Sequence, residues 1–326
     1  MDNAKIEGWI PYKLTHTENW PLCHWLDTFG LPFTEPFFDE TLIKCRSANT
    51  KGRGFGQVSS LDMMLEWSQG LNEVVPDAFI FHISRCGSTL VSQLLASSPK
   101  NVSLAEVPFF DDILRLPFKY PGFNEPEINS LLKAAVKYCS YKITAGGSQD
   151  EQKPGFLFIK ADSWHIFFYE QLRRLYPGVP FILMYRSPDE VFRSHRKLAG
   201  MQAVPGMIEP QLFGFKPDVV EQNAEVYIAN VLACYLKKYL EIAGNDTQCM
   251  LLNYSEGPMQ MITKIAAFAN INLSPQALLR MEERSHYHSK KPGERFSEDA
   301  VTGFPACLDN AMALYHVLEE KRLAIS

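Results

Sequence analysis

Residues 79–95 restrict the possible folds and functions of this chain more than any other segment. Their sequence, FIFHISRCGSTLVSQLL, has the pattern of an apolar strand, a short polar turn and an amphipathic helix. The start of such a helix presents unpaired backbone N–H groups and the positive end of the helix dipole at one point. Gly87 would let a ligand approach the backbone closely, and Ser88, Thr89 and Arg85 add hydroxyl and guanidinium donors. The segment therefore predicts a binding site for phosphate or sulfate.

The nucleotide-binding pattern GxxxxGK[ST] limits the chemistry of this predicted site. His82 stands in place of the first glycine, and Ser88 stands in place of the lysine. Kinases and NTPases need that lysine on the transferred phosphates. A cysteine-dependent phosphatase is disfavoured as well, because Ser92 lies where an arginine of the loop would hold phosphate. For Cys86, packing of a small side chain is favoured over a covalent role, since the motif supplies no histidine partner.

The composition indicates a large protein without the marks of a nucleic-acid or membrane protein. The chain has 326 residues, of which 46% are hydrophobic, enough for a large core. A net charge of −5 argues against a broad nucleic-acid surface. The seven cysteines lack the spacing of a zinc site or a disulfide framework, which favours reduced thiols in the cytoplasm. No signal-peptide pattern and no membrane span are expected, since no apolar run reaches about 18 residues.

Two regions of different character divide the chain. Residues 1–76 contain four of the five tryptophans and little periodicity, and they are expected to form an irregular, aromatic-rich appendage packed on the main domain. Its role is either structural or in substrate recognition. Residues 77–326 alternate between apolar runs and helical patterns, which predicts a doubly wound α/β domain with a mainly parallel sheet. Strands are expected at 78–83, 101–104, 156–160, 180–185 and 248–252. Helices are expected at 88–97, 126–141, 162–176, 188–199, 218–243, 257–269, 275–285 and 307–324.

A second segment, residues 181–194, repeats the design of the first. Its sequence, FILMYRSPDEVFRS, predicts a strand, a turn and a helix that starts at Pro188. Asp189 and Glu190 in the first helical turn disfavour an anion directly on this helix terminus. Arg186 at the strand end and Ser194 two turns into the helix are the expected anion-binding residues.

The two segments together resemble the sulfotransferase family that uses 3′-phosphoadenosine-5′-phosphosulfate (PAPS). Its motif P-[KR]-S-G-[ST]-T for the 5′-phosphosulfate is similar to the run Ser84, Arg85, Cys86, Gly87, Ser88, Thr89. Its motif R-[NS]-P-x-[DE]-x-x-x-S for the 3′-phosphate is similar to residues 186–194, with the interval from Arg186 to Ser194 intact. The chain departs from the first motif at Ser84 and Cys86, and neither change removes a charge. The resemblance covers about residues 78–296 and implies the P-loop-like sulfotransferase fold.

Three further matches fall outside these two motifs. Lys160 ends an apolar strand, an unfavourable place for a cation that does not face a site, and resembles the strand-end lysine of bacterial members. The turn at 253–256 resembles the family's strand-Tyr-Glu-Asp turn, whose polar residues are expected to brace the fold. Lys290 and Lys291 resemble a basic loop that closes over the nucleotide.

The resemblance implies sulfuryl transfer with PAPS as donor, adenosine 3′,5′-bisphosphate as product and no metal. Arg85 and Lys160 are the expected cations that neutralise the leaving phosphate. Three residues are candidates for the general base, with Glu106 ranked first, His165 second and Asp162 third. The alternative for Asp162 is a helix N-cap, and the alternative for His165 is an imidazole packed among aromatic side chains.

Two other functions stay open: a nucleotide kinase with a degenerate loop, and a nucleotide-binding protein without transfer activity. The acceptor of the sulfuryl group is not predicted. Residues 1–76 and 201–215 are the candidates for its pocket, because acceptor pockets are built from variable loops.

Overall fold

The computed structural model describes residues 8–50, 57–98, 100–140, 155–217, 221, 223–286 and 303–325. These residues form two compact units. The first combines Met1–Asp77 with Ser92–Asp162 and Gln171–Pro177, and so extends beyond the N-terminal 76 residues. The second combines Ala78–Val91, Ser163–Glu170 and Gly178–Ser326.

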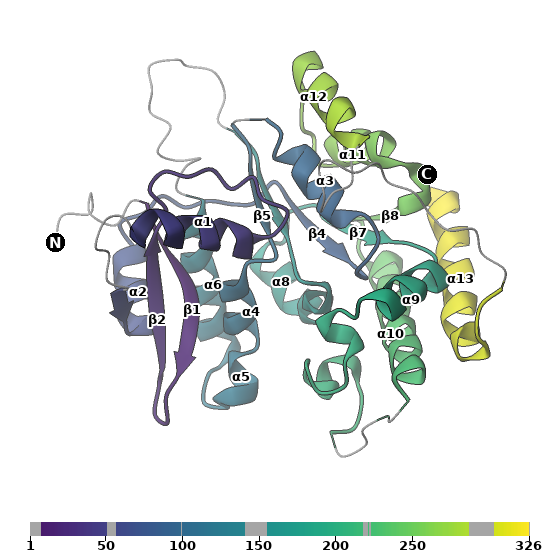
Figure 1. Ribbon diagram of the computed structural model, residues 1–326, viewed down its shortest axis with the longest axis horizontal. Coiled ribbons are helices and arrows are strands. Elements are labelled where there is room, and N and C mark those ends of the chain that lie inside the picture. The colour runs from purple at the N-terminus through teal and green to yellow at the C-terminus, as the bar shows by residue number, and fades with distance from the viewer. Residues whose placement is uncertain are drawn as a thin grey trace. The chain divides into compact units, whose positions relative to one another are not determined.

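The N-terminal segment in the first unit is more regular than the sequence indicates. Strands β1 (Trp9–His16), β2 (Pro21–Asp27) and β3 (Gln57–Ser59) form an antiparallel sheet, accompanied by α1 (Phe38–Thr50) and α2 (Leu61–Ser68) (Figure 1). A bulge between Pro11 and Lys13 breaks the alternation of β1, which hides this strand in the sequence. Trp25 anchors the sheet, because its indole N–H donates to Ser59 Oγ (2.9 Å) and its ring packs on Tyr138.

The rest of the first unit holds two parallel strands and several helices. Strands β5 (Val102–Ala105) and β6 (Leu157–Lys160) pair in register, with Ala105 opposite Lys160. The helices are α4 (Pro108–Leu114), α5 (Leu116–Lys119) and α6 (Glu125–Cys139). Asn124 begins α6 with a reciprocal capping box to Glu127. The polar ends of β5 and β6 therefore lie next to each other.

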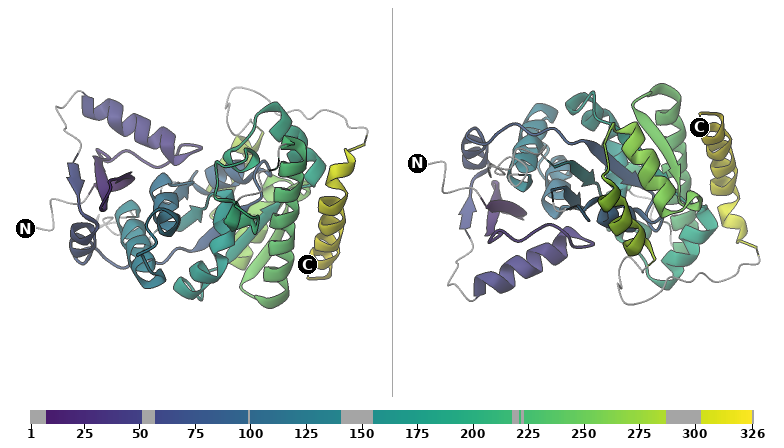
Figure 2. Two further views of the ribbon diagram at one scale, coloured as in Figure 1. Left: turned by 90° about the horizontal axis from the view of Figure 1, so that it is seen from below. Right: turned by 90° about the horizontal axis from the view of Figure 1, so that it is seen from above.

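The second unit is built on strands β4 (Ala78–His82), β7 (Phe181–Tyr185) and β8 (Cys249–Asn253), which pair in parallel in that order. Helix α3 (Ser88–Leu95) follows β4, α9 (Pro188–Lys197) follows β7, and η5 (Tyr254–Glu256) follows β8. Helix α10 (Ala224–Asn245) lies alongside α13 (Asp309–Ile325) in both views of Figure 2. The other elements of this unit are η2 (Ser163–Phe168), η3 (Met201–Ala203), η4 (Pro210–Phe213), α11 (Pro258–Phe268), α12 (Pro275–Ser285) and η6 (Ala306–Leu308). Helix α8 (Tyr169–Leu175) begins in this unit and continues in the first from Gln171.

The sheet order β5-β6-β4-β7-β8 confirms the predicted doubly wound α/β fold. From β4 the chain crosses to β5 and β6 on one side and then returns to β7 and β8 on the other. The order therefore reverses at β4, and ligands of such sheets bind at the carboxyl end of the strand where this happens. The loop after β4 is the one that the sequence singles out.

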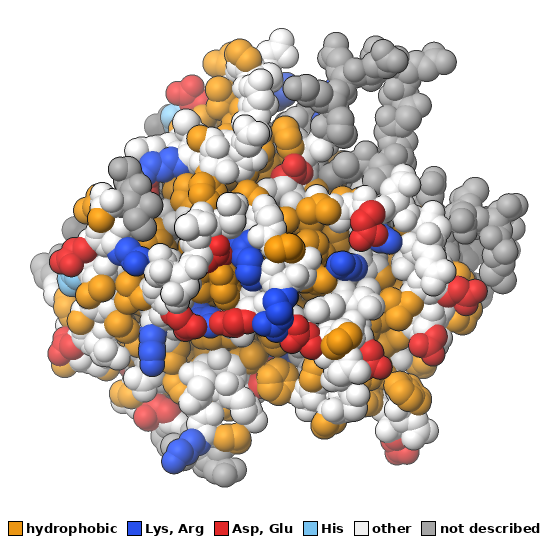
Figure 3. All heavy atoms as spheres, turned by 180° about the vertical axis from the view of Figure 1, so that it is seen from behind, with side chains coloured by type: hydrophobic (Ala, Val, Ile, Leu, Met, Phe, Trp, Pro, Cys, Tyr) orange, Lys and Arg blue, Asp and Glu red, His pale blue; other side chains and the backbone are white. Residues whose placement is uncertain are grey.

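The expected helix at 162–176 begins as a 3₁₀ turn, η2, and becomes α-helical only at Tyr169. Its first turns carry Trp164, His165, Phe167 and Phe168, bulky aromatic residues with low helix propensity. None of the described helices is long and apolar enough to cross a membrane. Acidic and basic side chains are interspersed on the face shown in Figure 3.

Candidate active site

The loop after β4 has a strained backbone. Ser84 and Arg85 have φ angles of 70° and 52°, and Gly87 follows at 79°. Residues other than glycine rarely adopt this left-handed backbone conformation, and such strained residues are common at functional sites. The backbone N–H of Ser84 donates to Nδ1 of His82 at 3.1 Å. His82, at the place of the first P-loop glycine, therefore braces the loop.

The side chains of this loop point in different directions. Arg85 donates through Nη2 to the carbonyl oxygen of Leu198 at 2.8 Å. Cys86 is completely buried, with its thiol 3.5 Å from the carbonyl oxygen of Met184, as expected for a packed side chain. Ser88 and Thr89 are buried at the start of α3.

Tyr254, just after β8, joins the loop to the second predicted motif. A Cβ atom at Gly87 would lie 2.5 Å from Cδ2 of Tyr254, so the ring fills the space that a side chain would need. The guanidinium carbon of Arg186 lies 4.5 Å from the centroid of the same ring. The sequence indicates only a bracing turn here, because ring contacts between residues 87, 186 and 254 leave no local pattern.

Replacing Gly87 with alanine should therefore destabilise the protein by at least about 2 kcal/mol, since it combines an unfavourable φ with an overlap against Tyr254. Urea unfolding measures this loss. Gly122→Ala is the matched control, because a Cβ there meets no atom within 4 Å. Equal stability of the two variants would contradict this prediction. The double variant Gly87→Ala with Tyr254→Ala should recover the part of the lost unfolding free energy that comes from overlap with the ring.

Arg186 is held by two partners at the end of β7. Its Nε donates to Glu190 Oε2 at 2.8 Å and its Nη2 donates to Glu190 Oε1 at 3.1 Å, while its face lies on Tyr254. Ser194 lies two turns further along α9 and is half-buried. Burial opposes ionisation of Asp189, but hydrogen bonds from Ser187 and Arg193 lower its pKa, so the first turn of α9 stays negative. This agrees with assigning anion binding to side chains rather than to the helix terminus.

In the first unit, Lys160 is completely buried at the end of β6 and forms an ion pair with Glu106. Its ammonium also lies 5.3 Å from the ring centroid of Phe37. Glu106 follows β5 with a φ of 53°, and its backbone N–H donates to the carbonyl oxygen of Lys160 at 2.8 Å. The structure thus brings two sequence-predicted site residues together, 54 positions apart in the chain.

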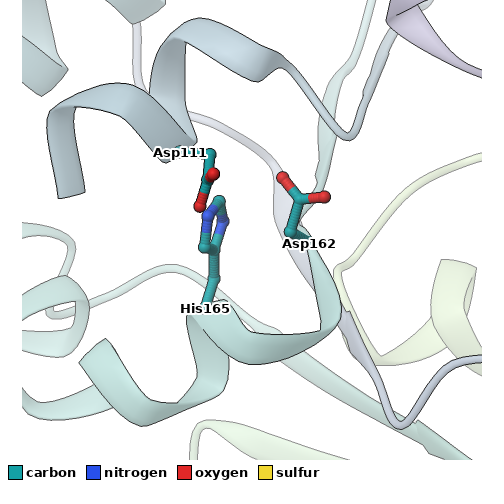
Figure 4. A group of neighbouring side chains, drawn as sticks. All are labelled: Asp111, Asp162 and His165. Carbon is teal, nitrogen blue, oxygen red and sulfur yellow. The ribbon is translucent and has the colours of Figure 1, made fainter. Parts of the chain in front are cut away.

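Asp162 lies two residues beyond Lys160 and is buried among other acidic groups. Burial, followed by the charges of Glu106 and Asp111, raises its pKa well above the ordinary value, against the opposing charge of Lys160. Figure 4 shows the carboxylates of Asp111, on α4, and Asp162, together with His165. Such carboxylates could serve as metal ligands by type, but Asp111 pairs with Arg115 at 2.8 Å, and Lys160 supplies positive charge to Asp162.

Asp162→Asn should raise the stability of the protein, and only above about pH 4. The folded state holds the Asp162 proton more tightly than the unfolded chain, whose aspartates titrate near about 3.9. Unfolding free energy is therefore lost as the pH rises from that value through the raised folded pKa. Urea unfolding of the wild type and the variant at several pH values between about pH 3.5 and pH 8 measures the difference in their free energies of unfolding. A difference that stays constant with pH would contradict this origin.

His165 is buried in η2 among aromatic rings. Its ring packs edge-on against Trp164 at 6.1 Å and against Phe168 at 6.3 Å between centroids. These contacts favour the packing alternative for His165 over the role of general base. Lys290 and Lys291 lie outside the described residues.

Comparison with known proteins identifies the family of this chain. A family model described as "Sulfotransferase family" matches residues 76–274. The chain therefore belongs to the sulfotransferase family, a class of transferases. A search of curated proteins found no match.

Several solved structures are similar to this chain at low identity. The "Sulfotransferase Domain from the Curacin Biosynthetic Pathway" is 15% identical, with 76% of this chain and 99% of that chain covered and a TM-score of 0.47. Sulfotransferase STF9 from Mycobacterium avium is 17% identical, with 90% and 87% covered and a TM-score of 0.46.

Proposed function

We propose that this protein transfers a sulfuryl group from PAPS to an acceptor hydroxyl or amine and releases adenosine 3′,5′-bisphosphate. The observation that carries the proposal is the contact of one ring, Tyr254, with both Gly87 and Arg186. The contact supports the proposal because the two segments proposed to bind anions adjoin the same ring, at the carboxyl ends of the adjacent parallel strands β4 and β7. A nucleotide with phosphates at its 5′ and 3′ positions needs two such sites.

In this proposal the donor is bound by the residues of the two motifs. Ser84, Arg85, Cys86, Gly87, Ser88 and Thr89 hold the 5′-phosphosulfate, while Arg186 and Ser194 hold the 3′-phosphate. Glu190 keeps the Arg186 guanidinium in one orientation through two hydrogen bonds. Lys290 and Lys291 are also proposed to bind the nucleotide.

The transfer step is assigned to three charged residues. The acceptor oxygen attacks sulfur and forms the new S–O bond, while the bond from sulfur to the oxygen of the 5′-phosphate breaks. Arg85 and Lys160 neutralise the charge that develops on the leaving phosphate, the task of Mg²⁺ in kinases. Glu106 takes the acceptor proton, and its ion pair with Lys160 holds its carboxylate at the ends of β5 and β6.

Family membership favours this reading over the two alternatives. A kinase would need the loop lysine that Ser88 replaces. A binding protein without transfer would not need the buried ion pair of Lys160 and Glu106. The cytoplasm stays the predicted location, in keeping with seven cysteines outside disulfides.

Calorimetric titration with nucleotides tests the donor assignment. Adenosine 3′,5′-bisphosphate should bind at least about tenfold more tightly than AMP, which lacks the 3′-phosphate that Arg186 and Ser194 are proposed to hold. Binding should not require Mg²⁺. Tighter binding of ATP in the presence of Mg²⁺ would favour the kinase alternative, and no binding of the bisphosphate would overturn the proposal.

A further inference from the structure

The ten residues that follow α9 form a loop without charge. The sequence from Leu198 to Met207 is LAGMQAVPGM, in a chain whose residues are 21% charged. Four large apolar side chains of this loop are exposed: Leu198 (68%), Met201 (42%), Val204 (40%) and Met207 (48%). Single exposed apolar residues are common, but four within ten residues are typical of a binding surface. We call residues 198–207 the apolar loop.

The apolar loop is held in a defined shape by its polar groups. The backbone N–H of Gly200 donates to Nδ1 of His195 at 3.1 Å, and Gln202 lies 3.5 Å from the other ring nitrogen. Both side chains are buried. A Cβ atom at Gly200 would lie 2.8 Å from Oε1 of Gln202, so the chain packs closely there. The polar side chain thus faces inward and the apolar ones face solvent, the reverse of an ordinary exposed loop.

The apolar loop also adjoins the candidate active site within the second unit. Its first residue, Leu198, accepts through its carbonyl oxygen the hydrogen bond from Arg85 at 2.8 Å. The helix that ends at this loop, α9, carries Ser194 and follows Arg186. A molecule seated on the apolar loop would therefore lie beside Arg85, one of the residues proposed to hold the 5′-phosphosulfate.

We propose that the apolar loop binds the carbon skeleton of the acceptor, so that the acceptor is an alcohol or phenol with an apolar body. This inference rests on the proposed function. A sugar would need hydrogen-bonding side chains for its hydroxyls, and an anionic peptide would need cations, neither of which the loop exposes. Methionine side chains adapt to irregular apolar shapes, so acceptors of different outline fit. The acceptor oxygen forms the new S–O bond and gives its proton to the general base of the proposed function, while the bond from sulfur to the 5′-phosphate oxygen breaks.

The test compares 2-naphthol and octan-1-ol with methyl β-D-glucoside as acceptors for PAPS. The two apolar alcohols should show a kcat/KM at least about 30-fold higher than the glucoside. Met201→Glu with Met207→Glu should raise the KM for 2-naphthol by about tenfold and leave kcat and the affinity for adenosine 3′,5′-bisphosphate unchanged. Leu279→Glu, at an exposed apolar position on α12, is the control and should change none of these.

A binding measurement separates this inference from the proposed function. Quenching of 2-naphthol fluorescence, titrated with the bisphosphate present, reports the apolar loop without any transfer. Loss of 2-naphthol binding in the double variant would support the apolar loop as the acceptor site. If no acceptor is sulfated in the same experiments, the proposed transfer activity fails while the binding site stands. Unchanged 2-naphthol binding in the double variant, or preference for the glucoside, would overturn this inference alone.

Discussion

Arg186→Ala should weaken the affinity for adenosine 3′,5′-bisphosphate by about 100-fold, measured by calorimetry. One charge-assisted hydrogen bond to a phosphate contributes about 1.5–3 kcal/mol, and about 2.7 kcal/mol corresponds to a factor of 100. The variant also removes the guanidinium that pairs with Glu190, so the negative charge of Glu190 is left uncompensated next to the phosphate. Tyr254 would lose the cation on its face as well.

The control for this variant is Arg196→Ala on α9, the helix that follows Arg186. Arg196 is largely exposed and pairs with Glu225 at 3.1 Å, so its loss changes net charge equally without touching Tyr254. Its affinity for the bisphosphate should stay within about twofold of the wild type, as expected for a screened surface charge. If both variants lost affinity to the same extent, the effect would come from overall charge and Arg186 would have no specific role.

Lys160→Met should both abolish transfer and destabilise the fold, by about 3–5 kcal/mol. Removing one partner of a buried ion pair leaves the other charge uncompensated, which is more costly than removing both. Glu106, after β5, and Asp162, after β6, would then interact without the opposing charge of the ammonium. Urea unfolding and a PAPS-dependent transfer assay measure the two effects.

Lys160→Met combined with Glu106→Gln separates the two roles. Because the double variant removes both charges, it should recover most of the lost stability. Transfer should stay absent, since the variant lacks both the cation for the leaving phosphate and the proposed base. Recovery of transfer together with stability would show that the pair is only structural.

The sequence predicts the parallel α/β fold well because its strands are continuous apolar runs followed by helical patterns. It also identifies the loop at 84–89 and the end of β7, since turn chemistry is local. The antiparallel sheet of the N-terminal segment escapes prediction, because the bulge in β1 shifts its alternation. Its register depends on Trp25 packing against Tyr138, more than a hundred residues away.

The missed features of the candidate site share one physical origin, contacts between residues far apart in the chain. Tyr254 lies against Gly87 and Arg186 only because β8, β7 and β4 are neighbours in the sheet. The sequence names residues 201–215 among the candidates for the acceptor pocket, but the exposure of the apolar side chains and the inward turn of Gln202 are seen only in the structure. The opposite holds for Lys160, whose burial and need for a partner follow directly from its place at the end of an apolar strand.

The most direct test of the account is transfer of radiolabelled sulfuryl from PAPS, with the product bisphosphate measured in the same reaction. The wild-type protein should label an acceptor hydroxyl and release one bisphosphate for each label transferred, without added metal. Lys160→Met and Arg186→Ala should both fail at donor concentrations that saturate the wild type. Bisphosphate binding without any transfer to apolar or polar acceptors, or full transfer by Lys160→Met, would contradict the proposed function.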